Sequence, residues 1–422
     1  MCMMISKTAF MIAAPASGSG KTTIARGLMA LLAQKGVKVQ PFKCGPDYID
    51  TKFHETVCGQ PSINLDTFMA SREHVQELFA RYGAGADVCI VEGMMGLFDG
   101  YDRDKGSSAE IAATLGIPVV LVVDAKSAAY SMAPLLQGFI NFRKDVHIRG
   151  VIFNKVGSER HYRMLKEVCD DLGIECLGYL PKQTVLEQGS RYLGLDFSEE
   201  TDHHELVGLL EKYVNWRRLL TFNEMTARCP RDDGSLPARL RLVVARNMES
   251  FSFIYQEMTD HFEDVRFFDP ETEVPALEGV DLLYLPGGYP EKHLEALVGN
   301  EDCRKAIKEY AERGGRIQAE CGGMMYLCEK IVTDDGKYPM CGVLPYTITA
   351  RKADRKLSLG YRQFVLDDKE YRGHEFHYTQ FMGDSPQSVT QVYNAKGEPV
   401  STPVFRYKNV FASYTHLYEI IG

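Results

Sequence analysis

Short apolar runs alternate with longer stretches of helical periodicity along the first half of the chain. The apolar runs are rich in β-branched residues and contain few polar positions, which is typical of strands buried on both faces of a parallel sheet. We predict strands at residues 8–14, 37–42, 88–91, 118–123 and 150–153. One helix is predicted over residues 22–34. Another starts at the capping-box spacing Ser107 to Glu110 and ends at Gly116.

The alternation of apolar runs and helical stretches is interrupted near the middle of the chain and resumes in the second half. A polar, helix-like stretch covers about residues 202–223, and residues 228–237 have the Pro, Gly and Asp content of a linker. Strands are predicted again at 240–245, 265–268, 282–285 and 316–319, and short alternating segments beyond residue 341 indicate antiparallel strands. We therefore predict two α/β domains, residues 1–228 and 240–422, joined by a linker at 229–239.

Composition narrows the class of protein. The chain has 422 residues, enough for two or three domains, and 48 basic against 57 acidic residues give a net charge of −9. With no Lys/Arg cluster, no nucleic acid or anionic membrane is expected as a partner. The apolar run at 117–123 is too short to cross a bilayer. Eleven cysteines without a Cys-x-x-Cys pair indicate reduced thiols. These features predict a soluble, cytoplasmic protein.

A phosphate-binding loop is predicted between the first strand and the first helix. The segment APASGSGKTT (residues 14–23) has the context of a P-loop, although Pro15 stands where the strict motif has glycine. Backbone N–H groups of such a loop surround a phosphate, the lysine reaches the β- and γ-phosphates, and the threonine binds Mg²⁺. Asn154 follows a strand and could present its amide to adenine. The predicted ATP-binding residues are Gly18, Ser19, Gly20, Lys21, Thr22, Thr23 and Asn154.

Acidic residues suited to magnesium follow other strands of the same predicted sheet. Glu92 ends the strand at 88–91, and Asp47 lies in CGPDYID just past the second strand. Asp99 lies in the next loop, LFDGYDRD. Because strand ends meet at the ligand-binding edge of a parallel sheet, Thr22, Asp47 and Glu92 are the candidate metal ligands.

A second candidate site is a cysteine on a sharp turn. The segment AECGG (residues 319–323) lies between a predicted strand and a helix, like a nucleophile elbow. We expect the helix N-terminus to favour the Cys321 thiolate. The backbone of Gly322, with that of Gly287 or Gly288, would supply an oxyanion hole. His416 is the candidate base, with His374 and His377 as rivals that sequence spacing cannot separate.

Together these motifs resemble the glutamine-dependent a,c-diamide synthases of corrin and related tetrapyrrole biosynthesis. The resemblance spans almost the whole chain and rests on residues 14–23, 44–50, 91–100, 285–291, 319–323, 373–378 and 412–417. It implies a P-loop domain similar to dethiobiotin synthetase, followed by a class I glutamine amidotransferase domain.

Roles follow from that resemblance position by position. The loop residues would hold ATP, and Asp47, Glu92 and Asp99 match family acidic positions implicated in magnesium binding and activation of the substrate carboxylate. Cys321 and His416 match the glutaminase nucleophile and base, with Gly288 and Gly322 as oxyanion donors. Many amidotransferases carry a glutamate two residues after the histidine, whereas this chain has Tyr418, so the orientation of His416 is left open.

The implied reaction is ATP-dependent amidation of the a and c carboxylates of cobyrinic acid, through an acyl phosphate and with ammonia from glutamine. Its cofactor would be Mg²⁺, its substrates ATP, glutamine and the tetrapyrrole, and a homodimer is possible. Nickel-sirohydrochlorin and hydrogenobyrinic acid are alternative substrates, and the longer cobyric acid synthases are related. A P-loop switch protein with a degenerate glutaminase domain is the alternative from another class. The alanine at position 16, where partitioning ATPases carry lysine, speaks against it.

Overall fold

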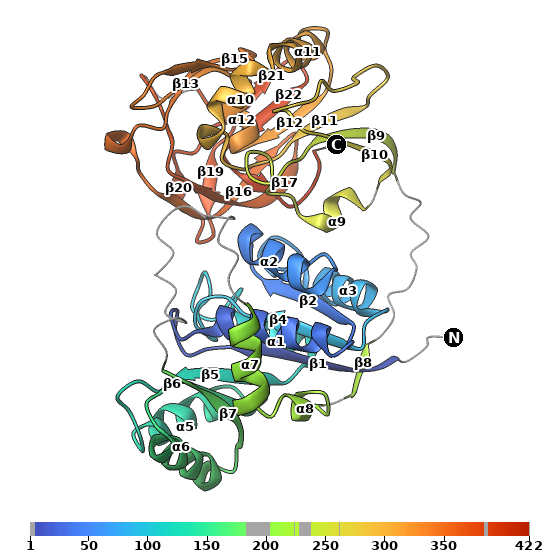
Figure 1. Ribbon diagram of the computed structural model, residues 1–422. Helices are drawn as coiled ribbons and strands as arrows, with labels where there is room; N and C mark the ends of the chain where they lie inside the picture. Colours follow the sequence, from blue (N-terminus) through green and yellow to red (C-terminus); the bar gives the residue numbers. More distant parts are fainter. Residues whose placement is uncertain are drawn as a thin grey trace. The chain divides into compact units, whose positions relative to one another are not determined.

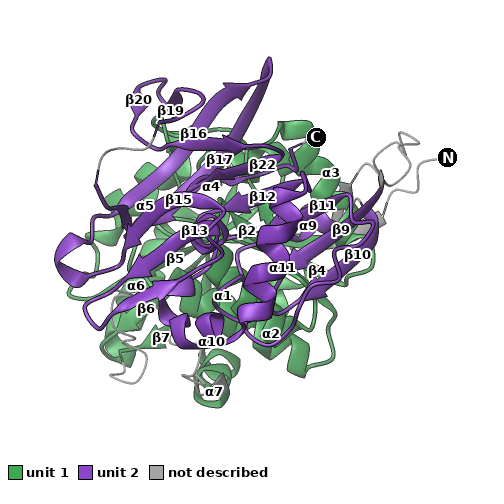
Figure 2. Ribbon diagram, turned by 90° about the horizontal axis from the view of Figure 1, so that it is seen from above, with its two compact units in different colours: residues 1–233 green, residues 234–422 purple. Residues whose placement is uncertain are grey.

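The computed structural model (Figure 1) describes residues 5–182, 203–222, 224–227, 238–260, 262–383 and 387–421. The chain forms two compact units, Met1–Asp233 and Gly234–Gly422, coloured separately in Figure 2. Most of the predicted linker, residues 228–237, lies outside the described residues. Strand β9 begins at Ala238, inside the range predicted to be linker.

The first unit is built on one largely parallel sheet, as predicted. Its strand order is β3-β2-β4-β1-β5-β6-β7, and only β8 runs antiparallel, along the first residues of β1. The strands are β1 (Ile5–Ala13), β2 (Val39–Cys44), β3 (Ile63–Leu65), β4 (Val88–Glu92), β5 (Val119–Asp124), β6 (Ile148–Val156), β7 (Glu175–Pro181) and β8 (Glu224–Ala227). Because β1 and β4 are adjacent, the loops that follow them meet at the same edge of the sheet.

Helices cover both faces of this sheet. The helices are α1 (Lys21–Gln34), α2 (Tyr48–Cys58), α3 (Arg72–Gly83), α4 (Ser108–Leu115), α5 (Met132–Phe142), α6 (Glu159–Leu172), α7 (His203–Tyr213) and α8 (Trp216–Leu219). Side chains of α1 and α7 share one buried cluster with Phe10 and Ile12, whereas α3, α4, α5 and α6 pack with Ala9 and Met11. Alternate residues of β1 thus face opposite hydrophobic layers, which explains its continuous apolar run.

The predicted helix boundaries have identifiable caps. The Ser107 hydroxyl accepts a hydrogen bond from the Glu110 N–H, and Gly116 ends α4 in the left-handed conformation. Helix α2 was not predicted, since its sequence YIDTKFHETVC has a polar composition. It begins because the Asp47 carboxylate accepts the N–H groups of Ile49 and Asp50.

The described residues of the second unit form three sheets. The main one has the order β10-β9-β11-β12-β22-β21, parallel except for β21. Its strands are β9 (Ala238–Ala245), β10 (Phe262–Phe268), β11 (Leu282–Leu285), β12 (Ile317–Glu320), β21 (Val404–Tyr407) and β22 (Val410–Ser413). Its helical segments are α9 (Gln256–Thr259), η2 (Pro290–Lys292), α10 (Leu294–Gly299), α11 (Glu301–Glu312), α12 (Gly322–Leu327) and η3 (Lys352–Asp354).

The other two sheets are mostly antiparallel, as predicted beyond residue 341. One has the order β14-β13-β15-β18 and the other β20-β19-β16-β17-β23. Their strands are β13 (Cys328–Val332), β14 (Lys337–Pro339), β15 (Leu344–Thr349), β16 (Ser358–Leu366), β17 (Lys369–His377), β18 (Gln380–Phe381), β19 (Val392–Asn394), β20 (Pro399–Val400) and β23 (His416–Leu417). The pairing of β17 with β23 places His374 opposite His416.

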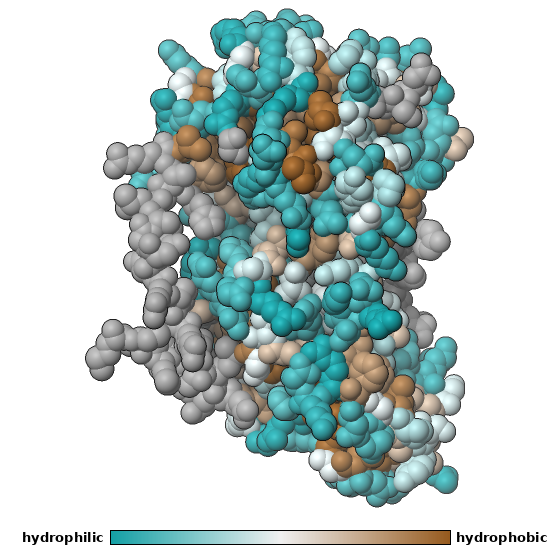
Figure 3. Space-filling view, turned by 180° about the vertical axis from the view of Figure 1, so that it is seen from behind, coloured by the Kyte–Doolittle hydropathy of each residue, from teal (hydrophilic) through white to brown (hydrophobic). Residues whose placement is uncertain are grey.

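Among the helices within the described ranges, none combines the length and the apolar character needed to cross a bilayer. The face drawn in Figure 3 is mostly hydrophilic, with hydrophobic residues scattered over it.

Candidate active sites

The loop between β1 and α1 forms a glycine-dependent cradle at the N-terminus of a 14-residue helix. Gly18 and Gly20 have φ angles of 79° and 91°, the left-handed region that favours glycine. A Cβ on Gly20 would lie 2.1 Å from the side-chain amide of Asn154. That amide donates to the Ser19 carbonyl over 3.0 Å. The structure thus brings Asn154 to the loop, where it supports the loop backbone.

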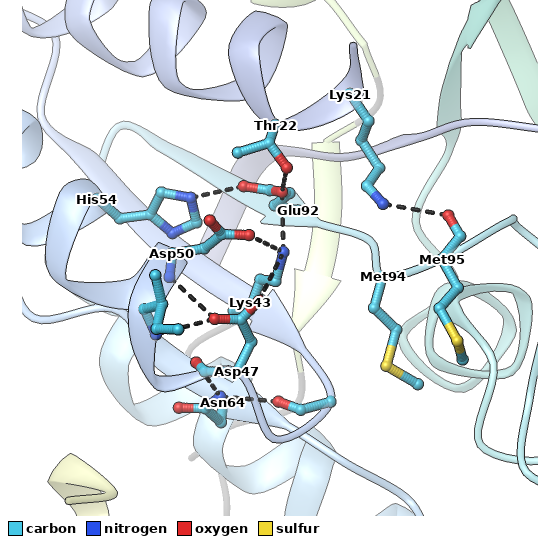
Figure 4. A network of polar contacts seen from close by, with 12 residues as sticks. Lys21, Thr22, Lys43, Asp47, Asp50, His54, Asn64, Glu92, Met94 and Met95 are labelled. Atoms are coloured by element: carbon cyan, nitrogen blue, oxygen red, sulfur yellow. Dashed lines mark hydrogen bonds and ion pairs between the residues drawn. The ribbon is translucent and has the colours of Figure 1, made fainter. Parts of the chain in front are cut away.

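From the start of α1, Thr22 points toward Glu92 at the end of β4, and Lys21 points toward Met95 in the loop after it (Figure 4). The Lys21 ammonium donates to the Met95 carbonyl over 3.1 Å, and burial together with the nearby Lys43 lowers its pKa. The Thr22 hydroxyl donates to Glu92 Oε1 over 2.5 Å. Lys21 and Thr22 therefore reach different groups at the same sheet edge.

Lys43 organises the acidic groups beside this loop, although the sequence analysis did not select it. Its Nζ lies 2.6 Å from Asp50 Oδ2, 2.8 Å from Glu92 Oε1 and 3.8 Å from Asp47 Oδ2. The lysine and Glu92 are both buried. Burial alone would lower the pKa of Lys43, but these carboxylates raise it above its ordinary value. The available signal was a lysine inside an otherwise buried strand, which requires a charged partner.

Glu92 is the centre of the network. Its second oxygen, Oε2, lies 2.7 Å from Nε2 of the buried His54, whose other ring nitrogen contacts the Ser62 hydroxyl. Burial would raise the pKa of Glu92, but Lys43 and the hydrogen bond from His54 lower it to about 2. Glu92 is therefore ionised at neutral pH, and the side chains of Thr22, Lys43 and His54 contact it.

The two predicted aspartates have different places. Asp47 uses Oδ1 to cap α2 and presents Oδ2 toward Lys43. Asp99 lies in the loop after β4, where its Oδ2 accepts the Gly96 N–H over 2.9 Å. That loop touches the phosphate cradle, since the Leu97 N–H donates to the Ala14 carbonyl. Asp99 is thus near the cradle but makes no described contact with the Glu92 network.

The donor set fits magnesium only in part. Within the described ranges, no group of three or more His, Cys, Asp or Glu side chains is arranged to hold a metal ion by itself. Magnesium in nucleotide sites needs only one or two protein oxygens, with phosphates and water completing its shell. The Thr22 hydroxyl and the Glu92 carboxylate are adjacent oxygen donors of that kind, whereas Asp47 is occupied as a helix cap. The metal roles of all three stay predictions.

The cysteine of the second unit lies on a strained turn. Cys321 has φ 46° and ψ −106°, between the end of β12 and the start of α12. A non-glycine residue with positive φ at a strand-to-helix turn is the geometry of a nucleophile elbow. The Cys321 N–H donates to the Ser413 carbonyl, which fixes the turn to β22. The segment that carries His416 begins directly after Ser413.

The glycine pair 287–288 packs against both candidate residues. A Cβ on Gly287 would lie 2.0 Å from Cε1 of His416, and one on Gly322 would lie 2.8 Å from the Gly288 carbonyl. A Cβ on Gly288 would itself be 2.4 Å from the Ser250 carbonyl. A side chain at position 287 would therefore clash with His416, and one at position 322 would clash with the backbone of Gly288. The predicted oxyanion donors, Gly288 and Gly322, are adjacent.

The expected thiolate is wrong for the unliganded site. Burial and then the negative charge of Glu291 raise the pKa of Cys321, and the hydrogen bond from the Gly322 N–H offsets only part of this. Burial also lowers the pKa of His416 to about 3, with His374 and His377 adding to the effect. Both shifts favour the neutral thiol and the neutral imidazole, and the Cys321 thiol donates to the Phe376 carbonyl over 3.8 Å.

The rival His377 has structural contacts at both ring nitrogens. Nε2 lies 2.7 Å from Glu375 Oε1, Nδ1 lies 2.8 Å from the Thr379 carbonyl, and the ring stacks on Tyr414. His374 lies across the β17–β23 pairing from His416. The fully engaged ring of His377 favours His416 over His377 as the base, and these contacts do not separate His416 from His374.

Alternate side chains of β12 hold the backbone that follows His416. The Glu320 carboxylate accepts the Leu417 N–H. The Gln318 amide bonds the Glu419 carbonyl and the Ile421 N–H, over 3.2 and 2.8 Å. Gln318 also donates to Glu320 over 2.6 Å. We call Gln318 and Glu320 the clamp, because they hold the backbone of residues 417, 419 and 421, in a segment where Tyr418 occupies the position of the triad glutamate.

We expect Gln318→Ala to lower glutaminase kcat/KM by on the order of 10-fold while ammonium-dependent synthesis is kept. The variant loses two hydrogen bonds to the segment behind His416, worth about 1 kcal/mol each. Glutamate release measures the effect. Gln363→Ala is the matched control, since it loses a single bond to the Asn394 carbonyl on another sheet. Equal activity of the two variants would show that the clamp does not position His416.

These features define a class: a glutamine amidotransferase unit joined to a P-loop nucleotide-binding unit. Residues 10–193 match the CobQ/CobB/MinD/ParA nucleotide binding domain, and residues 247–419 match the CobB/CobQ-like glutamine amidotransferase domain. The chain belongs to the cobyrinate a,c-diamide synthase family. Members of this family are glutamine-dependent carbon–nitrogen ligases.

Three relatives document this membership. The chain is 40% identical to a cobyrinate a,c-diamide synthase of Caldanaerobacter subterraneus subsp. tengcongensis, over 97% of this chain and 94% of the relative. It is 38% identical to a hydrogenobyrinate a,c-diamide synthase of Brucella abortus, over 98% and 99% of the two chains. It is 36% identical to the hydrogenobyrinate a,c-diamide synthase of Mycobacterium tuberculosis, over 97% and 94%.

Proposed function

We propose that the chain amidates the a and c side-chain carboxylates of cobyrinic or hydrogenobyrinic acid in cobalamin biosynthesis, using ATP and glutamine. The proposal rests on one observation: this chain contains both a phosphate cradle and a cysteine elbow. It is also similar to such synthases over nearly its full length. A homodimer stays a prediction.

The first unit supports activation of the carboxylate. A carboxylate is a poor acyl donor, and transfer of the γ-phosphoryl group of ATP converts it to an acyl phosphate with release of ADP. Lys21, at the start of α1, would neutralise charge on the transferring group. Magnesium, when bound, would screen the phosphate charge, with Thr22 and Glu92 as its protein donors. Ammonia then attacks the acyl carbon, phosphate leaves, and the amide forms.

The second unit supports release of ammonia from glutamine. The Cys321 sulfur attacks the side-chain amide carbon while His416 takes the thiol proton, and N–H groups of Gly288 and Gly322 stabilise the oxyanion. His416 returns the proton to the leaving nitrogen, giving ammonia and a thioester. Water, deprotonated by the same histidine, hydrolyses the thioester to glutamate and the free thiol.

The choice of tetrapyrrole is tested by measuring each candidate substrate separately. Purified protein with ATP, Mg²⁺ and glutamine is given cobyrinic acid, hydrogenobyrinic acid or nickel-sirohydrochlorin, and ADP release gives kcat/KM for each. We expect one of the two corrinoids to be preferred. Preference for nickel-sirohydrochlorin would keep the reaction type and change the substrate.

Glu92→Gln is expected to weaken synthesis and its Mg²⁺ dependence while sparing glutamine hydrolysis. The amide removes a charge that pairs with buried Lys43 and His54, so the free energy of unfolding should also fall, by up to about 3–5 kcal/mol. Magnesium titration of ammonium-dependent synthesis and thermal unfolding measure the two effects. Exposed Glu73→Gln on α3 is the control. A normal titration curve for Glu92→Gln would remove this residue from the metal site.

A further inference from the structure

Glu291 is a carboxylate that the reaction described above does not use, and it lies beside the cysteine elbow. We infer that Glu291 binds the α-ammonium group of glutamine and thereby selects an α-amino acid as the nitrogen donor. The inference rests on the proposed glutaminase site at Cys321.

The position of Glu291 follows from the turn that carries it. Residues 290–292 form the short helix η2, directly after the glycine pair 287–288. A Cβ on Gly322 would lie 2.8 Å from Cδ of Pro290 and 3.0 Å from the Gly288 nitrogen. The turn therefore packs on the residue next to Cys321. Of the charged groups around the thiol, Glu291 has the largest effect on its pKa, ahead of Glu375 and Glu320.

One oxygen of this carboxylate lacks a donor. Glu291 Oε2 is buried and has no hydrogen-bond partner among the residues that the structure describes. Burial raises the pKa of Glu291, and the hydrogen bond from its own backbone N–H offsets only part of that effect. Leaving a buried acceptor unsatisfied costs about 1–3 kcal/mol, and more for a charged group, so such an atom calls for a partner.

Of the cationic residues whose charge acts on Glu291, which are Lys292, Arg355 and His293, the first and the last have other partners. His293 lies within 3.2 Å of both Glu249 and Glu271, and the Lys292 ammonium lies over the Tyr289 ring. Neither residue pairs with Glu291, and a bound ammonium group would favour the ionised form of this carboxylate. A glutamine whose side-chain amide carbon reaches Cys321 carries its ammonium group a few bonds away. That group has the sign and the N–H donors that Glu291 Oε2 lacks.

Glutaramate, which is glutamine without its α-amino group, tests the pairing. We expect Glu291→Gln to raise KM for glutamine on the order of 10- to 100-fold with little change in kcat, as expected for loss of a charged hydrogen bond. Wild-type protein should use glutaramate less well by a similar factor, and Glu291→Gln should barely distinguish the two compounds. Glu291→Asp should keep part of the discrimination. Exposed Glu295→Gln on α10 is the matched control.

The result that overturns the inference is unchanged discrimination. If Glu291→Gln hydrolyses glutamine poorly but prefers it over glutaramate as strongly as wild type, the carboxylate acts on the fold and not on the ammonium group. Wild-type protein that uses both compounds equally would also overturn it, without any variant. Cys321→Ala is run in parallel: if that variant still hydrolyses glutamine, the proposed site itself is wrong, a failure distinct from that of Glu291 alone.

Discussion

The Cys321→Ala variant is expected to lose glutamine-dependent amide formation by at least about 10³-fold, the usual effect of removing a covalent nucleophile. Synthesis from added ammonium should continue and should improve at higher pH, because more free ammonia is present. The phosphate cradle lies in the other compact unit, so its residues are unchanged. Amide product measured with glutamine and with ammonium separates the two activities.

Cys328→Ala is the matched control for that experiment. Cys328 is a buried thiol of the same unit, packed against Met324, and has no part in the elbow. We expect it to keep both activities, with some loss of stability from the small cavity. Loss of both activities in a folded Cys321→Ala protein would place this residue in the synthetase reaction, and retention of both would make it a structural thiol.

Lys21→Ala is expected to abolish amide formation with either nitrogen source. The ammonium group balances charge on the phosphates during transfer, a contribution on the order of several kcal/mol. Its one described hydrogen bond is to the Met95 carbonyl, so the variant leaves the contacts of Glu92 in place. Glutamate release and thermal unfolding should therefore change little, while ADP formation stops.

Lys35→Ala controls for the loss of a lysine from the same helix. Lys35 follows the far end of α1 and pairs with Glu211 of α7, away from the cradle. It should keep wild-type synthesis. Product formation by Lys21→Ala at the rate of Lys35→Ala would contradict the assignment of the phosphate site.

Local sequence signals predicted the elements that carry chemistry. The strand–loop–helix around Gly18 and Gly20 was predictable because it depends on residues that are close together in the sequence. These residues determine both the left-handed glycine conformations and the start of the helix. The elbow at Cys321 was predictable for the same reason, and its positive φ agrees with the motif. The parallel sheet followed from apolar runs that leave no polar face.

Contacts between residues far apart in the chain could not be predicted from the sequence. Lys43 and Glu92 are 49 positions apart, and no local pattern shows that they share one buried site. The clamp of Gln318 on residues 419 and 421 joins segments more than 100 positions apart. The prediction of a Cys321 thiolate failed because it counted the helix end and omitted burial and the charge of Glu291.

Glutamine labelled with ¹⁵N at its side-chain amide tests the central proposal most directly. Purified protein is incubated with ATP, Mg²⁺, labelled glutamine and the preferred corrinoid, and the product is analysed by mass spectrometry. We predict a product in which two OH groups are replaced by labelled NH₂ groups, through a transient monoamide. With labelled glutamine and excess unlabelled ammonium, the Cys321→Ala variant should give only unlabelled diamide, whereas the wild-type protein should still incorporate label. A tetrapyrrole that stays unamidated while ATP and glutamine are hydrolysed would contradict the proposed function.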